Sequence, residues 1–206
     1  MDSTEKLTEI FREFPGIGPR QAKRFVYFLL TRNNTYLNEF SELIKELKKH
    51  IRVCNTCYRF FPEDASASPI CTICKDMSRD SSKLMIVSKD VDFESIERSR
   101  SYKGYYFILG GTVPILDKNP EMRVRSKELI TTVEKKCSEG KIQEIILAMN
   151  LNPEGESTEE YVKNLLKDLI ETHSLKVSVL GRGLSTGTEL EYSDSETIKN
   201  ALKNRF

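Results

Sequence analysis

The chain has 206 residues, of which 38% are hydrophobic and 31% charged, and its 32 basic and 31 acidic residues leave a net charge of +1. This composition is typical of a globular protein with one to three domains, and no apolar run approaches the roughly 18 residues of a membrane span. The N-terminus lacks the basic start and apolar core of a secretory signal, so we expect a cytoplasmic protein without a membrane partner.

Three helices are predicted in the first part of the chain, at about 5–13, 19–32 and 36–50, because apolar residues recur there at helical spacing. In the second helix the apolar positions are Ala22, Phe25, Val26, Leu29 and Leu30, which we expect to form its buried face. In the third helix the apolar stripe consists of Leu37, Phe40, Ile44 and Leu47.

The turn between the first two helices reads FPGIGPR and lies in a stretch, 14–34, without any acidic residue. Glycine permits backbone conformations that other residues avoid, and Pro19 suits the first position of a helix. The turn therefore presents free N–H groups at a helix N-terminus, which attracts anions. We interpret it as a DNA-binding site that contacts phosphates and reads no bases. Its predicted residues are Gly16, Gly18, Arg20, Lys23 and Arg24. The alternative is an ordinary helical hairpin with a solvated basic face.

Two cysteine pairs, CNTC and CTIC, are separated by 13 residues, and Cys137 stands alone. Each pair can hold one ion from a tight turn, and two pairs complete a tetrahedral site. We predict one structural zinc per chain, in a module at about 52–80, with a surface loop at PEDASASP (62–69). Its ligands are Cys54, Cys57, Cys71 and Cys74. Two disulfides or free thiols are the alternative, which a cytosolic setting disfavours.

From residue 84 onward, short apolar runs alternate with stretches compatible with helices. This alternation predicts a parallel sheet with helices on both faces. The strands are expected at 84–87, 105–109, 144–149 and 176–180, and the helices at about 92–99, 124–138, 156–171 and 194–204.

Acidic residues follow the expected strand 144–149 in the loop NLNPEGES, and others lie near the end of the chain. Glu154 and Glu156 lie in the loop, and Glu189 and Glu191 lie in TELEY. Paired carboxylates can bind Mg²⁺. Alternatively, Glu156 or Ser157 simply begins the next helix.

Taken in order, these features resemble the bacterial RecR family of recombination mediators, from about residue 7 to the end. FPGIGPRQAKRFVYFLL is similar to the family's helix-hairpin-helix, and CNTC…CTIC to its zinc finger. VDFESIERSRSYKGYYFILGG and EIILAMNLNPEGESTEEY resemble its Toprim motifs, and LGRGLSTGTELEYSDSETIKNAL its Walker B-like segment. The resemblance implies a multi-domain α+β fold. Its parts are a helix-hairpin-helix region (1–51), a zinc finger (52–80), a Toprim domain (81–175) and a C-terminal strand, Walker B-like segment and helix (176–206).

The resemblance also implies a function. The family comprises non-enzymatic DNA-repair proteins that act with RecO and RecF at gaps and junctions to help load RecA. Its members form homodimers or ring-like homotetramers, and this chain would accordingly work at the nucleoid. Arg20, Lys23 and Arg24 then become DNA contacts. The acidic face of the Toprim domain would meet a partner protein through Asn150, Glu154, Glu156, Glu189 and Glu191.

One departure from the family concerns catalysis. Ser88-Lys89-Asp90 stands where the family usually has Glu-Glu-Pro, and Toprim nucleases and topoisomerases need a glutamate there. We therefore expect no enzymatic activity and little support for Mg²⁺. Two alternatives remain. One is an Mg-dependent nuclease or primase-like enzyme that uses Glu154 and Glu156, and the other is a zinc-braced protein scaffold whose hairpin serves only self-association.

Overall fold

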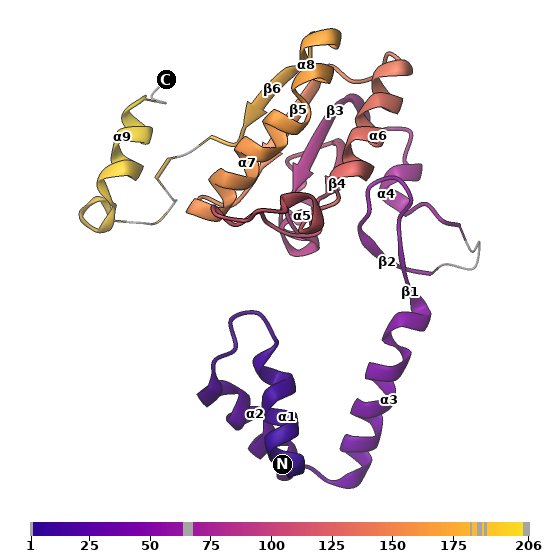
Figure 1. Ribbon diagram of the computed structural model, residues 1–206, viewed down its shortest axis with the longest axis vertical. Helices are drawn as coiled ribbons and strands as arrows, with labels where there is room; N and C mark the ends of the chain where they lie inside the picture. The colour runs from indigo at the N-terminus through magenta and orange to yellow at the C-terminus, as the bar shows by residue number, and fades with distance from the viewer. Residues whose placement is uncertain (1, 64–67, 182, 185–186, 188, 204–206) are drawn as a thin grey trace. The chain divides into compact units, whose positions relative to one another are not determined.

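The computed structural model describes residues 2–63, 68–181, 183–184, 187 and 189–203 (Figure 1). The centre of the predicted surface loop, 64–67, lies outside these residues. The chain divides into a first compact unit up to Ile51 and a second from Arg52 onward. Among the described helices, none combines the length and the apolar character needed to cross a bilayer.

The first unit contains the three predicted helices, which lie within a few residues of their expected bounds. They are α1 (Ser3–Arg12), α2 (Pro19–Leu30) and α3 (Asn34–His50). Asp2 is the N-cap of α1, and its carboxylate accepts a hydrogen bond from the amide of Glu5. Helices α1 and α2 pack together, and the rings of Phe11 and Phe25 meet edge-to-face at 5.6 Å.

The expected burial of the apolar stripe of α2 is only partly correct. Ala22 and Val26 of α2 are buried, but Leu30 is 63% exposed. No residue of α3 is buried, and Ile44 is 56% exposed. The spacing correctly marks an apolar face, but the described residues include no element that covers the face of α3.

The second unit contains the predicted parallel sheet, and its strand order among the described residues is β4-β3-β5-β6 (Figure 1). The central strand β3 pairs with β4 on one side and β5 on the other, so Leu84 faces Tyr105 and Ile145. The strands are β3 (Asp80–Val87), β4 (Gly104–Ile108), β5 (Glu144–Ala148) and β6 (Lys176–Val179).

Three helices, α6 (Ser126–Ser138), α7 (Pro153–Leu165) and α8 (Lys167–His173), cover one face of the sheet (Figure 1). The predicted helix 156–171 is thus two helices, and it begins earlier because Asn152 caps α7 and Pro153 occupies its first position.

The other face is covered differently from the prediction. Helix α5 (Asp90–Ser99) lies there with Phe93 buried, but part of the cover is the cysteine module. Cys54, Cys57 and Cys71 belong to the same buried cluster as Ile108 of β4. The cysteine module therefore shares the core of the sheet rather than forming a separate core.

The remaining elements are short or terminal. The cysteine module contains β1 (Ile51–Val53), β2 (Phe60–Pro62) and α4 (Thr72–Lys75). Single 3-10 turns occur at η1 (Pro120–Met122) and η2 (Leu190–Tyr192), and α9 (Ser195–Lys203) follows.

Candidate nucleic-acid interface and metal centre

The hairpin turn needs glycine at one of its two glycine positions. Gly16 has φ of +76°, in the left-handed region that favours glycine. Gly18 has φ of −82° and ψ of 170°, an extended conformation open to any residue, so the expectation of a special backbone is wrong there. A Cβ at Gly18 would meet no atom within 4 Å, so this position leaves open space in front of the backbone.

The N-terminus of α2 has unsatisfied donors. Gly18 is its N-cap and supplies no side-chain cap, Pro19 follows, and the first turn contains no acidic residue. The backbone amides of Gly18, Arg20 and Gln21 donate no hydrogen bond to any residue that the structure describes. Free amides at the positive end of a helix dipole favour an anion.

The predicted cations lie beside this N-terminus. Arg20, Lys23 and Arg24 are exposed, and none forms an ion pair with a carboxylate of the described residues. Arg24 only donates to the side-chain oxygen of Gln21 at 3.4 Å. Three cationic side chains therefore remain available to phosphate groups around the turn.

The four paired cysteines come together as predicted, with all Sγ atoms within 4.8 Å of one another. Three are fully buried and Cys74 is partly buried. The Sγ atoms of Cys57 and Cys71 are 3.6 Å apart, close to the separation of about 3.8 Å across a tetrahedral zinc with bonds of ~2.3 Å. This donor set fits a metal ion such as zinc.

The cysteines also show why an ion suits this cluster. The hydrogen bond with Cys57 lowers the pKa of Cys54, and the same contact raises the pKa of Cys57. A divalent ion bound by these sulfurs would displace their protons, because thiolates are the metal ligands. The amide of Cys71 donates to the Sγ of Cys54 at 3.3 Å, a contact that orients this ligand.

The second cysteine of CNTC is joined to the outermost strand, β4. The carbonyl of Cys57 accepts a hydrogen bond from the amide of Ile108 at 2.9 Å. The guanidinium of Arg125 donates to the carbonyls of Tyr58 and Ile108, both at 2.9 Å. These contacts couple the metal ligands to the sheet. Sequence reasoning missed Arg125, whose role depends on a tertiary contact that no local pattern signals.

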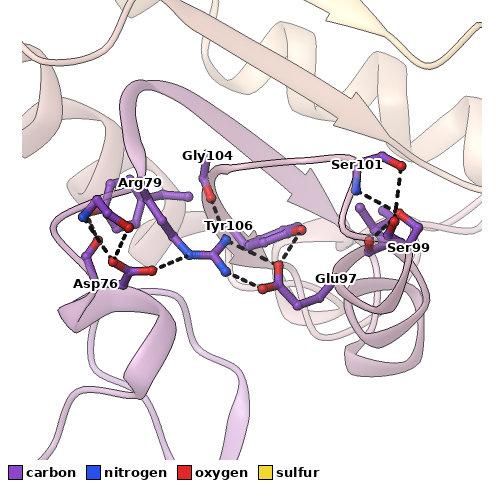
Figure 2. Close-up of polar contacts among 10 residues, drawn as sticks. Asp76, Arg79, Glu97, Ser99, Ser101, Gly104 and Tyr106 are labelled. Atoms are coloured by element: carbon purple, nitrogen blue, oxygen red, sulfur yellow. Dashed lines mark hydrogen bonds and ion pairs between the residues drawn. The ribbon is translucent and has the colours of Figure 1, made fainter.

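A second connection, between the end of the cysteine module and the elements of the sheet domain, centres on Arg79 (Figure 2). Its guanidinium pairs with the carboxylate of Glu97 in α5 and donates to the carbonyl of Gly104 at 3.1 Å. A carboxylate oxygen of Asp76 lies 3.6 Å from the Nε atom of Arg79. The hydroxyl of Tyr106 donates a hydrogen bond to the carboxylate of Glu97 at 2.9 Å. Burial lowers the pKa of Arg79, but Glu97 outweighs burial, so this pKa is raised.

The loops after β3 and β5 hold the other predicted residues. Ser88 is fully buried and its hydroxyl donates to the Sδ of Met149 at 3.2 Å. Asp90 accepts a hydrogen bond from the amide of Phe60 at 2.8 Å. The C-terminal end of β3 therefore carries no free carboxylate at the position of a Toprim catalytic glutamate.

The four predicted acidic residues form no metal-binding cluster among the described residues. Glu154 and Glu156 are exposed in the first turn of α7, and Glu154 accepts a hydrogen bond from Thr112 at 3.1 Å. Glu189 and Glu191 are exposed at η2. Among the described residues, only the four cysteines bring three or more potential metal ligands together.

Asn150 is exposed and its backbone lies against α7. A Cβ at Gly155 would stand 1.9 Å from the carbonyl oxygen of Asn150, so only glycine permits this approach. The close contact fixes the loop after β5 on the helix that carries Glu154.

Comparisons with known proteins agree with this architecture. Residues 4–48 match the family model described as "RecR, helix-hairpin-helix", residues 82–181 match "Toprim domain", and residues 183–205 match "RecR, C-terminal". A Recombination protein RecR of Bifidobacterium animalis subsp. lactis is 36% identical over 98% of this chain and 94% of its own length. The chain belongs to the RecR family.

Other RecR relatives extend over similar lengths. Recombination protein RecR of Legionella pneumophila subsp. pneumophila is 34% identical over 100% of this chain and 96% of its own length. The Recombination protein RecR of Dehalococcoides mccartyi is 31% identical over 98% of this chain and 93% of its own length. This RecR chain thus aligns over nearly its whole length.

Proposed function

We propose that the protein is a non-enzymatic, DNA-binding recombination mediator that acts in DNA repair, in the cytoplasm at the nucleoid. It would work with RecO and RecF at gaps and junctions to help load RecA. The observation that carries the proposal is the uncapped N-terminus of α2, with Arg20, Lys23 and Arg24 exposed beside free amides. The names of the relatives, which are recombination proteins, support it.

The hairpin would bind the sugar–phosphate backbone. The amides of Gly18 and Arg20 would donate to one phosphate, while Lys23 and Arg24 neutralise adjoining phosphates. Gly16 gives the turn its shape and Gly18 leaves room for close approach. Contacts of this kind carry no base information, so binding should not depend on sequence.

The metal would be one structural zinc ion per chain, held by Cys54, Cys57, Cys71 and Cys74. Four thiolates complete the coordination and leave no position for a substrate. Zinc would therefore stabilise the fold and take no part in chemistry.

We propose that Asn150 and four acidic residues contact a partner protein. The acidic residues are Glu154, Glu156, Glu189 and Glu191. Their exposure supports this role. Self-association into a dimer or a ring-like tetramer is supported by α3, whose apolar side chains are exposed in the single chain.

The test measures binding of the full-length protein to fluorescein-labelled gapped DNA by fluorescence anisotropy over a range of salt concentrations. The variant combines Arg20→Gln, Lys23→Gln and Arg24→Gln. We expect weaker binding to all sequences and a log–log salt slope smaller by about 0.9 for each lost phosphate contact. The control combines Lys45→Gln, Lys48→Gln and Lys49→Gln in α3, which removes the same charge. Equal binding by the hairpin variant and the wild type would refute the proposal.

The enzymatic alternative is tested by incubating the protein with labelled DNA and Mg²⁺ or Mn²⁺. Because Ser88 replaces the catalytic glutamate and is buried, we expect no cleavage. Specific cleavage that Glu154→Gln abolishes would establish a nuclease instead.

A further inference from the structure

A second basic feature lies in the second unit, between α5 and β4. Residues 98–103, which we call the basic segment, read RSRSYK. Their cations, Arg98, Arg100 and Lys103, are all exposed. None of them forms an ion pair with any residue that the structure describes.

Arg79 holds both ends of the basic segment (Figure 2). On one side it pairs with Glu97, the residue before the segment, and on the other it donates to the carbonyl of Gly104, the residue after it. Between these ends, the amide of Asp80 donates to the carbonyl of Lys103 at 2.9 Å. The segment is thus fixed to the sheet rather than loosely attached.

The interior of the segment is also ordered by local contacts. Arg100 has φ of +56° and closes α5, with its amide donating to the carbonyl of Glu97 at 3.1 Å. The ring of Tyr102 packs edge-to-face on Tyr106 at 5.0 Å, and its hydroxyl donates to the carbonyl of Tyr105. A cationic segment that is ordered before binding loses less conformational entropy when it binds.

The neighbouring carboxylates are already neutralised. Glu97 pairs with Arg79 and accepts from Tyr106, and Asp76 lies 3.6 Å from the same guanidinium. Asp80 pairs with Lys83 at 3.0 Å. Glu94 lies one turn before Arg98 in α5, but the two form no ion pair among the described contacts. The three cations of the segment are therefore exposed and outside any ion pair that the structure describes, with Glu94 as an exposed carboxylate nearby.

We propose that the basic segment binds the phosphate backbone of DNA as a second, sequence-independent contact, in addition to the hairpin. The inference rests on the proposed DNA-binding function. The hydroxyls of Ser99 and Ser101 already donate to the backbone carbonyls of Ile96 and Ser99. The guanidinium and ammonium groups of Arg98, Arg100 and Lys103 would therefore make the contact, because both kinds of group donate to phosphate oxygens. Two contact sites on one chain raise the affinity through their high effective concentration.

The experiment compares three variants of the full-length protein with the wild type on the same fluorescein-labelled gapped DNA, by anisotropy at several salt concentrations. The first combines Arg98→Gln, Arg100→Gln and Lys103→Gln. The second is a control of equal charge, Lys118→Gln, Lys127→Gln and Lys167→Gln, at exposed lysines of the second unit without an ion pair among the described residues. The third is the hairpin variant.

We expect the basic-segment variant to bind roughly tenfold more weakly for each lost phosphate contact at about 0.1 M salt, with a salt slope smaller by about 0.9 per contact. The control should bind like the wild type. An unchanged thermal midpoint of the variant would show that the weaker binding does not come from unfolding.

Two results would overturn the inference. If the basic-segment variant and the control bind alike, while the hairpin variant binds weakly, the inference fails and the proposed function stands. If the wild type does not bind DNA, both fail. Weak binding by the basic-segment variant with normal binding by the hairpin variant would support the segment and refute the hairpin contact.

Discussion

The two units of the chain differ in how completely they bury their apolar residues. In the second unit, both faces of the sheet are covered and the buried side chains form two continuous clusters. In the described part of the first unit, only Thr8, Ala22 and Val26 are buried, and the apolar face of α3 lies open. The second unit thus has a continuous core on both faces of its sheet, although single side chains such as Leu116 and Met122 are exposed there, whereas the first unit buries few side chains.

This difference assigns different work to the two units. Exposed apolar faces mark interaction surfaces, and a helix that buries nothing gains little stability from its own chain. The first unit therefore presents exposed apolar side chains and exposed cations that are available for contacts with other molecules.

The largest expected effect comes from removing one cysteine ligand. Cys57→Ser should abolish metal binding and destroy the cooperative unfolding of the second unit, since Cys57 lies in the core cluster that covers one face of the sheet. Structural zinc contributes on the order of 10–16 kcal/mol, more than a domain's net stability. Zinc content and thermal unfolding followed by circular dichroism measure both effects.

The matched control is Cys137→Ser, because Cys137 lies in α6 outside the cluster. It should keep both the metal and the transition. A metal-free Cys57→Ser protein with the thermal midpoint of the wild type would show that the cysteine module is independent of the sheet.

The next effect concerns self-association through α3. Ile44→Glu places a charge on the exposed apolar face and should shift the protein toward a monomer, because burying an unpaired charge at an interface costs several kcal/mol. The chain should still fold, since Ile44 is 56% exposed. Light scattering coupled to size-exclusion chromatography gives the mass.

Asn38→Glu, which adds the same charge on another face of α3, is the control for this experiment and should leave the mass unchanged. If Ile44→Glu also leaves the mass unchanged, the open face of α3 does not join subunits.

A smaller effect is expected at the connection between the cysteine module and the sheet. Arg79→Ala leaves the carboxylate of Glu97 without its cation, and we expect a loss of about 2–3 kcal/mol in the free energy of unfolding, below the range for fully buried pairs because Glu97 is partly exposed. Urea denaturation measures this loss.

Lys83→Ala provides the comparison, because it breaks the exposed pair with Asp80, which solvent screens, and should cost much less than Arg79→Ala. Equal losses in the two variants would mean that Arg79 acts as an ordinary surface residue.

The smallest effect depends on pH. A hydrogen bond from the Ser82 hydroxyl, with help from Lys83, lowers the pKa of Asp80 from 3.8 to about 2. A lowered pKa stabilises the folded state above pH ~4, and this contribution is lost as the pH falls toward 2. Ser82→Ala should therefore lower the thermal midpoint slightly at pH 6, and the difference should vanish near pH 2.

Ser95→Ala serves as its control, because the Ser95 hydroxyl donates to a backbone carbonyl and any loss should not follow the titration of a carboxylate. A Ser82→Ala deficit that persists unchanged to pH 2 would contradict the assignment to Asp80.

The parts of the site that sequence predicts well are those encoded by local spacing. The cysteine pairs come together because each C-x-x-C places two sulfurs in one turn, and the parallel sheet follows from alternating apolar runs and helices. The start of α7 is also readable from the sequence, since Asn152 and Pro153 are typical of a helix N-terminus. Our prediction begins this helix three residues too late, at Glu156.

Sequence could not predict what depends on distant neighbours. Periodicity marks the apolar faces of α2 and α3 but does not say what covers them, so the expected burial is wrong for Leu30 of α2, and Ile44 of α3 is exposed as well. The contacts of Arg79 and Arg125 join segments far apart in the chain, and no local pattern signals them. The hairpin lies between these cases. Its two glycines predict a turn, but only Gly16 adopts a backbone conformation that requires glycine.

The hydrogen bond from Ile108 to the carbonyl of Cys57 has a consequence for the metal-free chain. Strand β4 lies at the margin of the sheet, and an unprotected margin recruits strands from other molecules. The loop that carries a metal ligand shields that margin. Loss of zinc would therefore do more than weaken the fold, since it would uncover a template for aggregation, and depletion of the ion should cause precipitation.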